Sequence, residues 1–116
     1  MGKQDVMAKI LPKGKGVWVP IDHGVTDFPC VGLENIEATI TAIIAGGANV
    51  IVAHKGVVDK YSHLCEGTAT SMIAHLSAST RHGGKNHSNK VLVGDVDEAI
   101  MRGAVGVSVQ ANIGLT

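Results

Sequence analysis

Acidic, imidazole and amine side chains follow apolar runs at several places in this sequence. The run VWVPIDHGV, residues 17–25, is the first of these, and it turns polar at Asp22 and His23. Later runs behave in the same way, and their polar ends are His54 with Lys55, His75 with Ser77, and Gln110 with Asn112. Burying polar groups at the ends of apolar strands costs free energy unless they form hydrogen bonds or ion pairs, and a functional role is one reason to keep them there. These strand ends therefore predict a functional site.

Asp22 and Lys55 each allow a chemical role and a plainer one. Asp22 could take a proton from a hydroxyl and return it, as cleavage of a carbon–carbon bond requires, or it could cap the turn that follows. Lys55 could lose its proton in a buried setting and attack a ketone to form a Schiff base. It could instead keep its charge and bind an anionic substrate or pair with Asp22. The residues favour a charged Lys55 and leave both roles of Asp22 open.

Three histidines, His23, His54 and His75, stand at the ends of consecutive apolar runs and could together ligate a zinc ion. Their spacing matches no zinc signature. Adjacent residues of a strand also point in opposite directions, so Asp22 and His23 could not face the same ion. We therefore predict no metal site and no bound cofactor. The remaining histidines lie in polar loops and are predicted to be surface residues.

Strands and helices must alternate along the chain to position these groups. Apolar residues recur at helical spacing in some segments and run continuously in others, which separates helices from buried strands. The expected strands cover 16–21, 49–56, 71–77 and 104–114, and the expected helical segments cover 33–44, part of 57–70, and 96–102. Gly46, Gly47 and Gly103 are expected to end helices, because glycine readily adopts the left-handed conformation found there.

The order of these elements predicts an α/β fold. Apolar strands separated by helical crossovers are typical of a parallel sheet built from βα units. The spacing of roughly 30 residues per unit is that of a TIM barrel, and a full barrel takes ~250 residues. We expect the first half, about four βα units, of a TIM (β/α)8 barrel, with residues 1–116 as a single partial domain. The alternative is a small doubly wound sheet that is complete with these strands.

Composition narrows the class of protein further. Hydrophobic residues make up 45% of the chain and aromatics only 3%, which suits parallel strands under helices. Ten basic residues balance ten acidic ones, so nothing predicts binding to nucleic acid. The apolar runs are far shorter than the ~20 residues that span a membrane, and the start of the chain does not read as a signal peptide. Cys30 and Cys65 form no CxxC pattern, which favours a reduced, cytoplasmic protein.

Taken together, several segments resemble the archaeal-type class I aldolase family. They are VPIDHGV, GGANVIVAHKG, IAHLSAST and VDEAIMRGAVGVSVQANIG, and they occur in the family's order from about Gly16 to Gly114. Two activities occur in this family: fructose-bisphosphate aldolase and 2-amino-3,7-dideoxy-D-threo-hept-6-ulosonate synthase. The synthase opens an alternative route to 3-dehydroquinate and the aromatic amino acids. GGANVIVAHKG and VSVQANIG are more similar to the synthase, although Gln110 replaces the histidine of its usual His-Val-Asn. The resemblance favours the synthase, with the bisphosphate aldolase as the alternative.

The resemblance implies a Schiff base between a lysine and the substrate ketone, which provides an electron sink when the carbon–carbon bond breaks. It also implies that Asp22, in the DHG motif, is the catalytic proton acceptor. The segment after this motif contributes to substrate binding in the family. Together with the second strand end, this gives the expected sugar-phosphate-binding residues Asp22, His23, Gly24, Val25, Thr26, His54 and Lys55.

The family's tyrosine proton donor and Schiff-base lysine come after the fourth strand, and neither Tyr61 nor Lys55 matches them. The resemblance therefore implies a truncated first half that is inactive alone and works with a C-terminal half or as a homo-oligomer. Two alternatives stay open. One is a free-standing enzyme that uses Lys55 or a metal on the strand-end histidines. The other is a non-catalytic half-barrel that binds a sugar phosphate or assembles with a relative.

Overall fold

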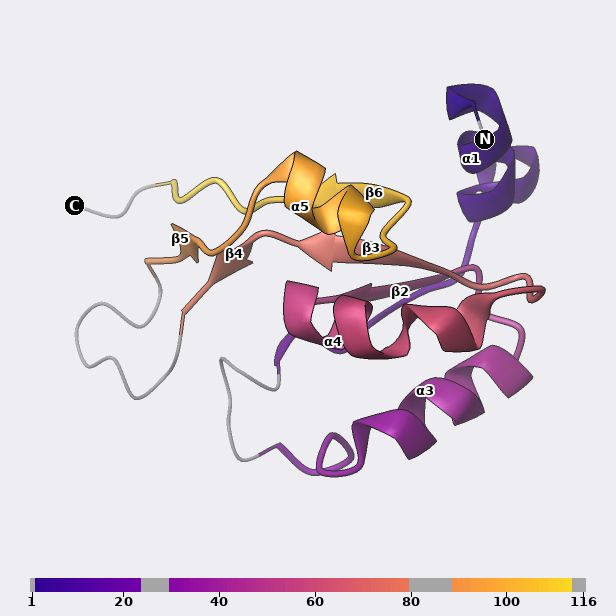
Figure 1. Ribbon diagram of the computed structural model, residues 1–116, viewed down its shortest axis with the longest axis horizontal. Coiled ribbons are helices and arrows are strands. Elements are labelled where there is room, and N and C mark those ends of the chain that lie inside the picture. Colours follow the sequence, from indigo (N-terminus) through magenta and orange to yellow (C-terminus); the bar gives the residue numbers. More distant parts are fainter. Residues whose placement is uncertain (1, 24–29, 80–88, 114–116) are drawn as a thin grey trace.

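The computed structural model describes residues 2–23, 30–79 and 89–113, and Figure 1 shows the arrangement of its elements. The main sheet contains β1 (Trp18–Pro20), β2 (Val50–Ala53), β3 (Ser71–His75) and β6 (Gly106–Ser108). The helices are α1 (Lys3–Ile10), α3 (Ile36–Ala45), α4 (Lys55–Tyr61) and α5 (Val96–Met101), with the 3-10 turns η1 (Pro12–Gly14) and η2 (Ser62–Cys65). A separate pair of short strands is formed by β4 (Ser77–Ala78) and β5 (Val91–Leu92).

The main sheet is parallel throughout, in the order β1-β2-β3-β6. This arrangement confirms the predicted sequence of strands and crossovers. Val50 pairs with Ser71 and Ala53 with Ala74, so β2 and β3 run side by side over the whole length of β2. Strands buried on both faces read as continuous apolar runs, which is why VIVA and SMIA show no alternation of polar and apolar residues.

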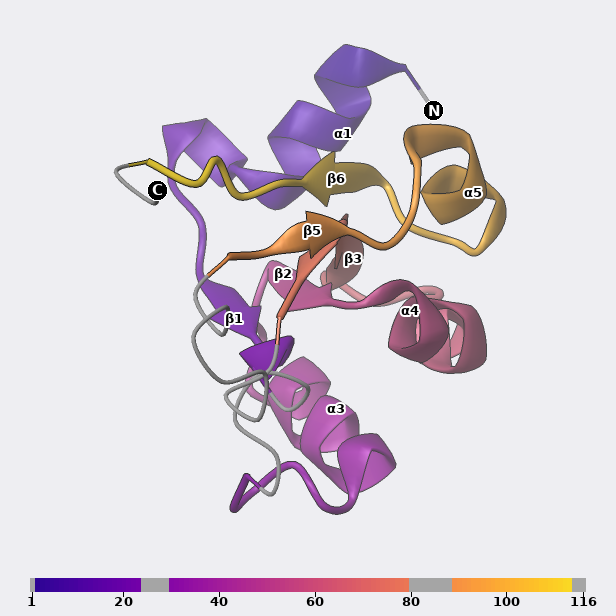
Figure 2. The same cartoon turned by 90° about the vertical axis from the view of Figure 1, so that its left-hand side faces the viewer.

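One face of the sheet is covered by α3, α4 and α5 (Figure 2). Ile40 of α3, Val58 of α4 and Ala99 of α5 join the same buried cluster as Ile51 and Met72 of the sheet. Fully burying an isoleucine, valine or methionine side chain stabilises the fold by about 1.5–3 kcal/mol. This layer fixes the positions of β2 and β3, and with them the groups at the strand ends.

The opposite face of the sheet receives the N-terminal helix α1, which the sequence analysis did not predict. Ile10 packs there against Val50 and Ile73, and Trp18 Nε1 donates a hydrogen bond to the Ile10 carbonyl oxygen at 2.9 Å. The helical spacing of Val6 and Ile10 was the available signal, since both lie on the face that packs on the sheet.

All four strands of the main sheet are shorter than predicted. The first covers only Trp18–Pro20 of the expected 16–21. The second ends at Ala53 rather than at residue 56, because His54 is already the N-cap of α4 and the helix begins at Lys55. The fourth covers only Gly106–Ser108 of the expected 104–114. The third also divides, since β3 ends at His75 and the next residues pair with β5 instead.

The ends of α3 and α5 have the caps that their sequences suggest. Asn35 Oδ1 accepts a hydrogen bond from the Ala38 amide at 3.1 Å, and Asp95 Oδ1 accepts one from the Glu98 amide at 2.8 Å. These side chains satisfy amide groups that have no partner inside the helix. After α3, Gly47 has a φ of +81°, as the prediction of a glycine stop requires.

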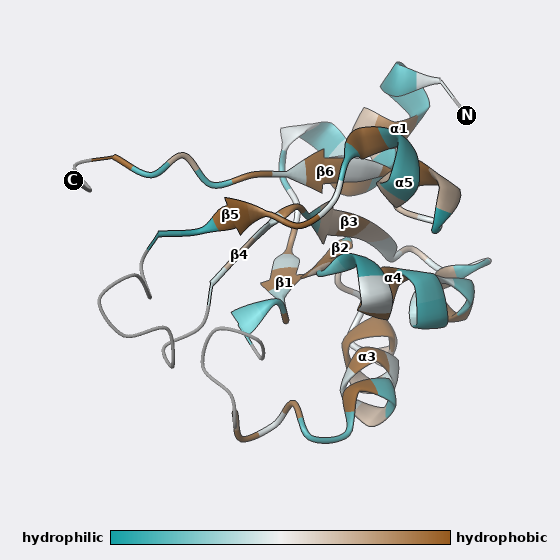
Figure 3. Ribbon diagram, turned by 60° about the vertical axis from the view of Figure 1, so that its left-hand side comes forward, coloured by the Kyte–Doolittle hydropathy of each residue, from teal (hydrophilic) through white to brown (hydrophobic). Residues whose placement is uncertain are grey.

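The β4–β5 pair extends beyond the carboxyl edge of the main sheet. Its apolar residues are open to solvent, with Val91 59% and Leu92 70% exposed, and Figure 3 shows β5 as a brown, hydrophobic ribbon.

No described helix is long and apolar enough to cross a membrane.

Candidate functional site at the carboxyl edge of the sheet

Four side chains form a row across the carboxyl edge of the sheet, each from the end of one strand or from the residues directly after it. They are Asp22, His54, His75 and Ser108. His75 of β3 pairs with Ser108 of β6. Continuing the register of β2 with β3 by one residue places His54 opposite His75, and continuing that of β1 with β2 by two places Asp22 opposite His54. The Ile21 amide, which bonds to the Val52 carbonyl at 2.8 Å, shows that the pairing of β1 and β2 does continue past Pro20.

This row faces away from α3 and α4. Alternate residues of a strand share a face, so His54 lies on the same side of β2 as Val50, and His75 on the same side of β3 as Ile73. Val50 and Ile73 pack against α1, opposite the covering helices. In a barrel, that face is the interior, and its carboxyl end is where active sites are found.

His75 is the centre of the row. Its Nδ1 lies 2.6 Å from Ser108 Oγ, and its Nε2 lies 3.8 Å from Asp22 Oδ2. The side chains of His75 and Asp22 are only 11% and 16% exposed. Nε2 is buried and has no hydrogen-bond partner within the described part of the chain. An acid, an imidazole and a hydroxyl from three strands thus converge on one side of the sheet.

Burial lowers the pKa of His75 below the ordinary value of 6.5. The carboxylate of Asp22 opposes this effect, whereas the charge of Lys90 and the neighbouring His54 add to it. The imidazole is therefore neutral at pH 7. A neutral imidazole carries one N–H and one lone pair, so it can donate toward one neighbour in the row and accept from the other.

His54 stands beside His75 and is tied to the same strand. Its Nδ1 donates to the carbonyl oxygen of His75 at 3.2 Å, and the two rings are 5.9 Å apart at an angle of 52°. The predicted site residues Asp22 and His54 are thus brought together with His75. His23, the other predicted histidine, is exposed. The predicted residues Gly24, Val25 and Thr26 lie outside the described residues.

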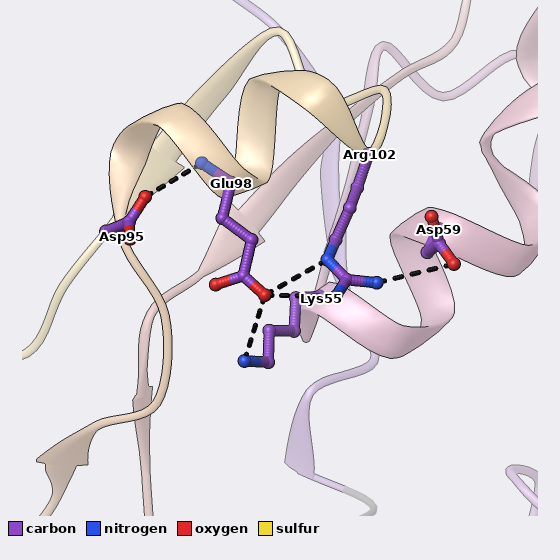
Figure 4. A network of polar contacts seen from close by, with 5 residues as sticks. All are labelled: Lys55, Asp59, Asp95, Glu98 and Arg102. Atoms are coloured by element: carbon purple, nitrogen blue, oxygen red, sulfur yellow. Dashed lines mark hydrogen bonds and ion pairs between the residues drawn. The ribbon is translucent and has the colours of Figure 1, made fainter.

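Lys55 is directed elsewhere, into an ion-pair network between α4 and α5 (Figure 4). Its Nζ lies 3.1 Å from Glu98 Oε1. The same oxygen accepts from Arg102, which also reaches Asp59 at 3.3 Å. Hydrogen bonds from Lys55 and then Arg102 lower the pKa of Glu98. The ion pair between Lys55 and Asp22 that the sequence allowed is therefore not formed: Lys55 pairs with Glu98, and Asp22 lies beside His75.

Two groups near the site, and the partner of Lys55, were not among the residues that the sequence predicted. Ser108 lies in the row itself, and the charge of Lys90 is near enough to act on His75. The carboxylate of Glu98 is the partner of Lys55. Of these groups, only Ser108 could have been recognised from the sequence, because it is a lone hydroxyl in an apolar strand. It was missed because the polar end of that strand was expected at Gln110.

The polar residues expected at the end of the fourth strand form a second cluster. The backbone amide of Gln110 donates to Ser77 Oγ at 3.0 Å. Asn112 donates to Asn89 Oδ1 at 2.9 Å and to the Lys90 carbonyl at 2.8 Å. These bonds hold the segment after β6 against the β4–β5 pair. Within residues 2–23, 30–79 and 89–113, no three His, Cys, Asp or Glu side chains are placed to hold a metal ion.

Comparison with known proteins points to one family. Residues 16–115 match the model of the DeoC/LacD family aldolases. A 2-amino-3,7-dideoxy-D-threo-hept-6-ulosonate synthase of Archaeoglobus fulgidus is 34% identical over 98% of this chain and 42% of its own length. The synthase of that name from Halobacterium salinarum is 34% identical over 97% of this chain. A 2-amino-4,5-dihydroxy-6-oxo-7-(phosphonooxy)heptanoate synthase of Streptomyces griseus is 36% identical over 83% of this chain and 34% of its own length.

Solved structures share the fold. An archaeal fructose 1,6-bisphosphate aldolase matches 90% of this chain and 42% of its own, with a TM-score of 0.71 and 23% identity. A second, with its catalytic lysine bound to a carbinolamine intermediate, matches with a TM-score of 0.69. The predicted fold class is confirmed: the sheet and its crossovers are the first half of a TIM barrel. The chain spans less than half the length of the relatives it matches.

Proposed function

We propose that this chain, which belongs to the DeoC/LacD aldolase family, takes part in Schiff-base carbon–carbon bond chemistry on a ketose phosphate. The observation that carries the proposal is the position of Asp22. It follows β1 in the row with His54, His75 and Ser108, at the strand edge where (β/α)8 enzymes hold their catalytic groups. The family resemblance read from the DHG motif and the matching family model support the same reading.

Asp22 is proposed as the proton acceptor. When the carbon–carbon bond breaks, its electrons move toward the imine carbon, and the hydroxyl on the departing carbon loses its proton to become a carbonyl. A carboxylate within hydrogen-bond reach of that hydroxyl can take the proton and later return it. The side chain of Asp22 is largely buried yet next to the exposed His23, so it can face a ligand while its other side rests against His75.

The synthase reaction is the proposed activity within the family. It is supported by relatives at 34% identity that carry the name 2-amino-3,7-dideoxy-D-threo-hept-6-ulosonate synthase. It is also supported by the similarity of GGANVIVAHKG and VSVQANIG to that branch. The solved fructose 1,6-bisphosphate aldolases, at 23% identity, share the fold alone. A cytoplasmic location and assembly with further βα units or further copies belong to the same proposal.

We further propose that no lysine of residues 2–23, 30–79 and 89–113 supplies the Schiff-base amine. Lys55 is engaged by Glu98 between two helices, away from the row. Lys90 acts on His75 through its charge, but its backbone is held by Asn112 beside the β4–β5 pair. Neither is placed on an inward-facing strand position next to Asp22. The relatives named above are more than twice as long as the matched segment, which leaves room for such a residue in the whole protein.

Ligand binding and borohydride trapping test the two proposals separately. Ligand-observed NMR with fructose 1,6-bisphosphate and dihydroxyacetone phosphate should detect binding to the chain. Asp22→Asn should weaken it by about tenfold or more, because a lost hydrogen bond to a charged group costs about 1.5–3 kcal/mol. The matched control Glu37→Gln, an exposed acid-to-amide change on α3, should leave binding unchanged. Binding that is absent, or that ignores Asp22→Asn, would refute the proposed site.

Borohydride reduction of the chain with the same ketose phosphates, followed by peptide mass mapping, locates any Schiff base. We expect no modified lysine. A stable adduct on Lys55 or Lys90 would place the electrophile inside this chain and overturn the second proposal, while supporting Schiff-base chemistry itself. Binding without turnover by the assembled protein would favour the non-catalytic half-barrel.

A further inference from the structure

His75 has a buried nitrogen that nothing in the described chain satisfies. Its Nε2 has no hydrogen-bond partner there, although the nearest carboxylate oxygen, Asp22 Oδ2, is 3.8 Å away. A native protein seldom leaves a buried polar atom unpaired, and such an atom calls for a physical reason. The other ring nitrogen is fully used, because Nδ1 lies 2.6 Å from Ser108 Oγ.

We propose that His75 is a positioning residue for Asp22: Ser108 donates its hydroxyl proton to Nδ1, which leaves the Nε2 proton directed at the Asp22 carboxylate. This inference rests on the proposed role of Asp22 as the base. His75 does not touch the substrate and transfers no proton. It keeps its single N–H while Asp22 takes and returns the substrate proton on its other oxygen.

The hydrogen-bonding capacities of the row fix this direction. A carboxylate only accepts, so any hydrogen bond between Asp22 and His75 needs the proton on Nε2. A neutral imidazole then has a lone pair on Nδ1, and a serine hydroxyl is the donor that suits it. The reverse arrangement would aim a lone pair at a carboxylate inside a buried space. The neutral state follows from the burial of His75, whose pKa Asp22 raises and Lys90 and His54 lower.

The distance of 3.8 Å is longer than a hydrogen bond. Contacts to catalytic groups are often long in the unliganded protein and tighten when the substrate is bound. Asp22 follows a three-residue strand at the sheet edge, whereas His75 ends the longest of the described strands. The His75 carbonyl oxygen accepts from His54 Nδ1, and the ring nitrogen Nδ1 of His75 is 2.6 Å from Ser108 Oγ. A small movement of Asp22 toward His75 would close the gap. One carboxylate oxygen would then be held, and the other would face the ligand.

Nitrogen-15 NMR of the imidazole rings in the full chain tests the inference without requiring activity. His75 should show a protonated Nε2 and an unprotonated Nδ1 at pH 7. Ser108→Ala should mix the two tautomers. Asp22→Asn should shift the Nε2 resonance and lower the pKa of His75 further, because it removes the one neighbour that raises that pKa. The matched control Glu66→Gln, an exposed acid at the far end of the sheet, should change neither.

A purely structural role for His75 predicts different results. The inference would be overturned if Nδ1 of His75 carried the proton, or if the Nε2 resonance were unchanged in the Asp22→Asn variant. A second arm follows the carboxyl carbon-13 chemical shift of Asp22 at pH 7. His75→Gln, which keeps an N–H donor, should leave this shift unchanged, and His75→Leu should move it. The two proposals can fail separately. If no variant binds the ligand but the His75 tautomer and the Asp22 carbon-13 shift behave as expected, the proposed function is refuted and the positioning contact stands.

Discussion

Lys55 Nζ and Glu98 Oε1 lie 3.1 Å apart and join α4 to α5. The same carboxylate oxygen is 3.0 Å from Arg102 Nη2, so two cations share one acceptor. The contact explains why a lysine directly after a buried strand takes no place beside Asp22. It gives the α4–α5 pair an electrostatic link, which we expect to respond to pH and to salt.

The Lys55–Glu98 contact should weaken in acid. Hydrogen bonds from its two partners lower the pKa of Glu98 below 4.5, so its contribution to stability is present above that pH and is lost as the pH falls through the lowered value. Glu98→Gln should remove this part of the pH dependence and reduce the effect of salt. Urea unfolding between pH 3 and pH 7 measures both, with the exposed Asp97→Asn as control. Equal curves for Glu98→Gln and the parent chain would contradict the role of the pair.

The buried His75 should make the fold less stable as the pH falls below neutrality. Its folded pKa is lowered from 6.5, so between 6.5 and that lower value the unfolded chain binds more protons than the folded one. Stability should decline as the pH falls through 6.5 and level off, for this group, below the folded pKa. His75→Gln should flatten that window in urea midpoints. The exposed His63→Gln should not, and a parallel response of the two variants would count against the burial of His75.

The two cysteines should differ in reactivity. Burial raises the pKa of the Cys65 thiol, an effect that the charge of Lys9 only partly offsets, and the side chain lies in the core cluster. The thiolate is the reactive form, so Cys65 should be unreactive in the folded chain. Ellman's reagent should titrate one thiol per chain at once and the second only in urea, and Cys30→Ser should abolish the fast phase. Two fast thiols would show that the core around Cys65 opens readily.

Two glycines with positive φ should tolerate alanine to different degrees. Gly47, with φ +81°, has open space where a Cβ would lie, whereas Gly103, with φ +109°, would direct a Cβ into the side chain of Ser62. Gly47→Ala should cost about 1–2 kcal/mol from the backbone alone. Gly103→Ala should cost about 1–3 kcal/mol more through overpacking. Urea unfolding of the pair measures the difference, and equal losses would mean that Ser62 moves aside without cost.

The sequence predicted the alternation of strands and helices well, because continuous apolar runs and helical periodicity are local features. It also predicted that Asp22 and His54 would share an edge, since parallel strands end on the same side. It did not predict Ser108, because strand register decides which residue of β6 meets His75, and an apolar strand such as AVGVSV does not mark its own register. The partner of Lys55 was missed for a related reason. Glu98 is distant in the chain and is brought near only by the packing of α4 on α5.

The bond from Trp18 Nε1 to the Ile10 carbonyl gives the molecule a built-in optical reporter. Trp18 is the chain's single tryptophan, and it stands on β1, four residues before Asp22. Its indole senses whether α1 is seated on the inward face of the sheet, because that bond exists only in the docked position. Its fluorescence should therefore follow the docking of the N-terminal segment in any titration or assembly experiment, without an added label.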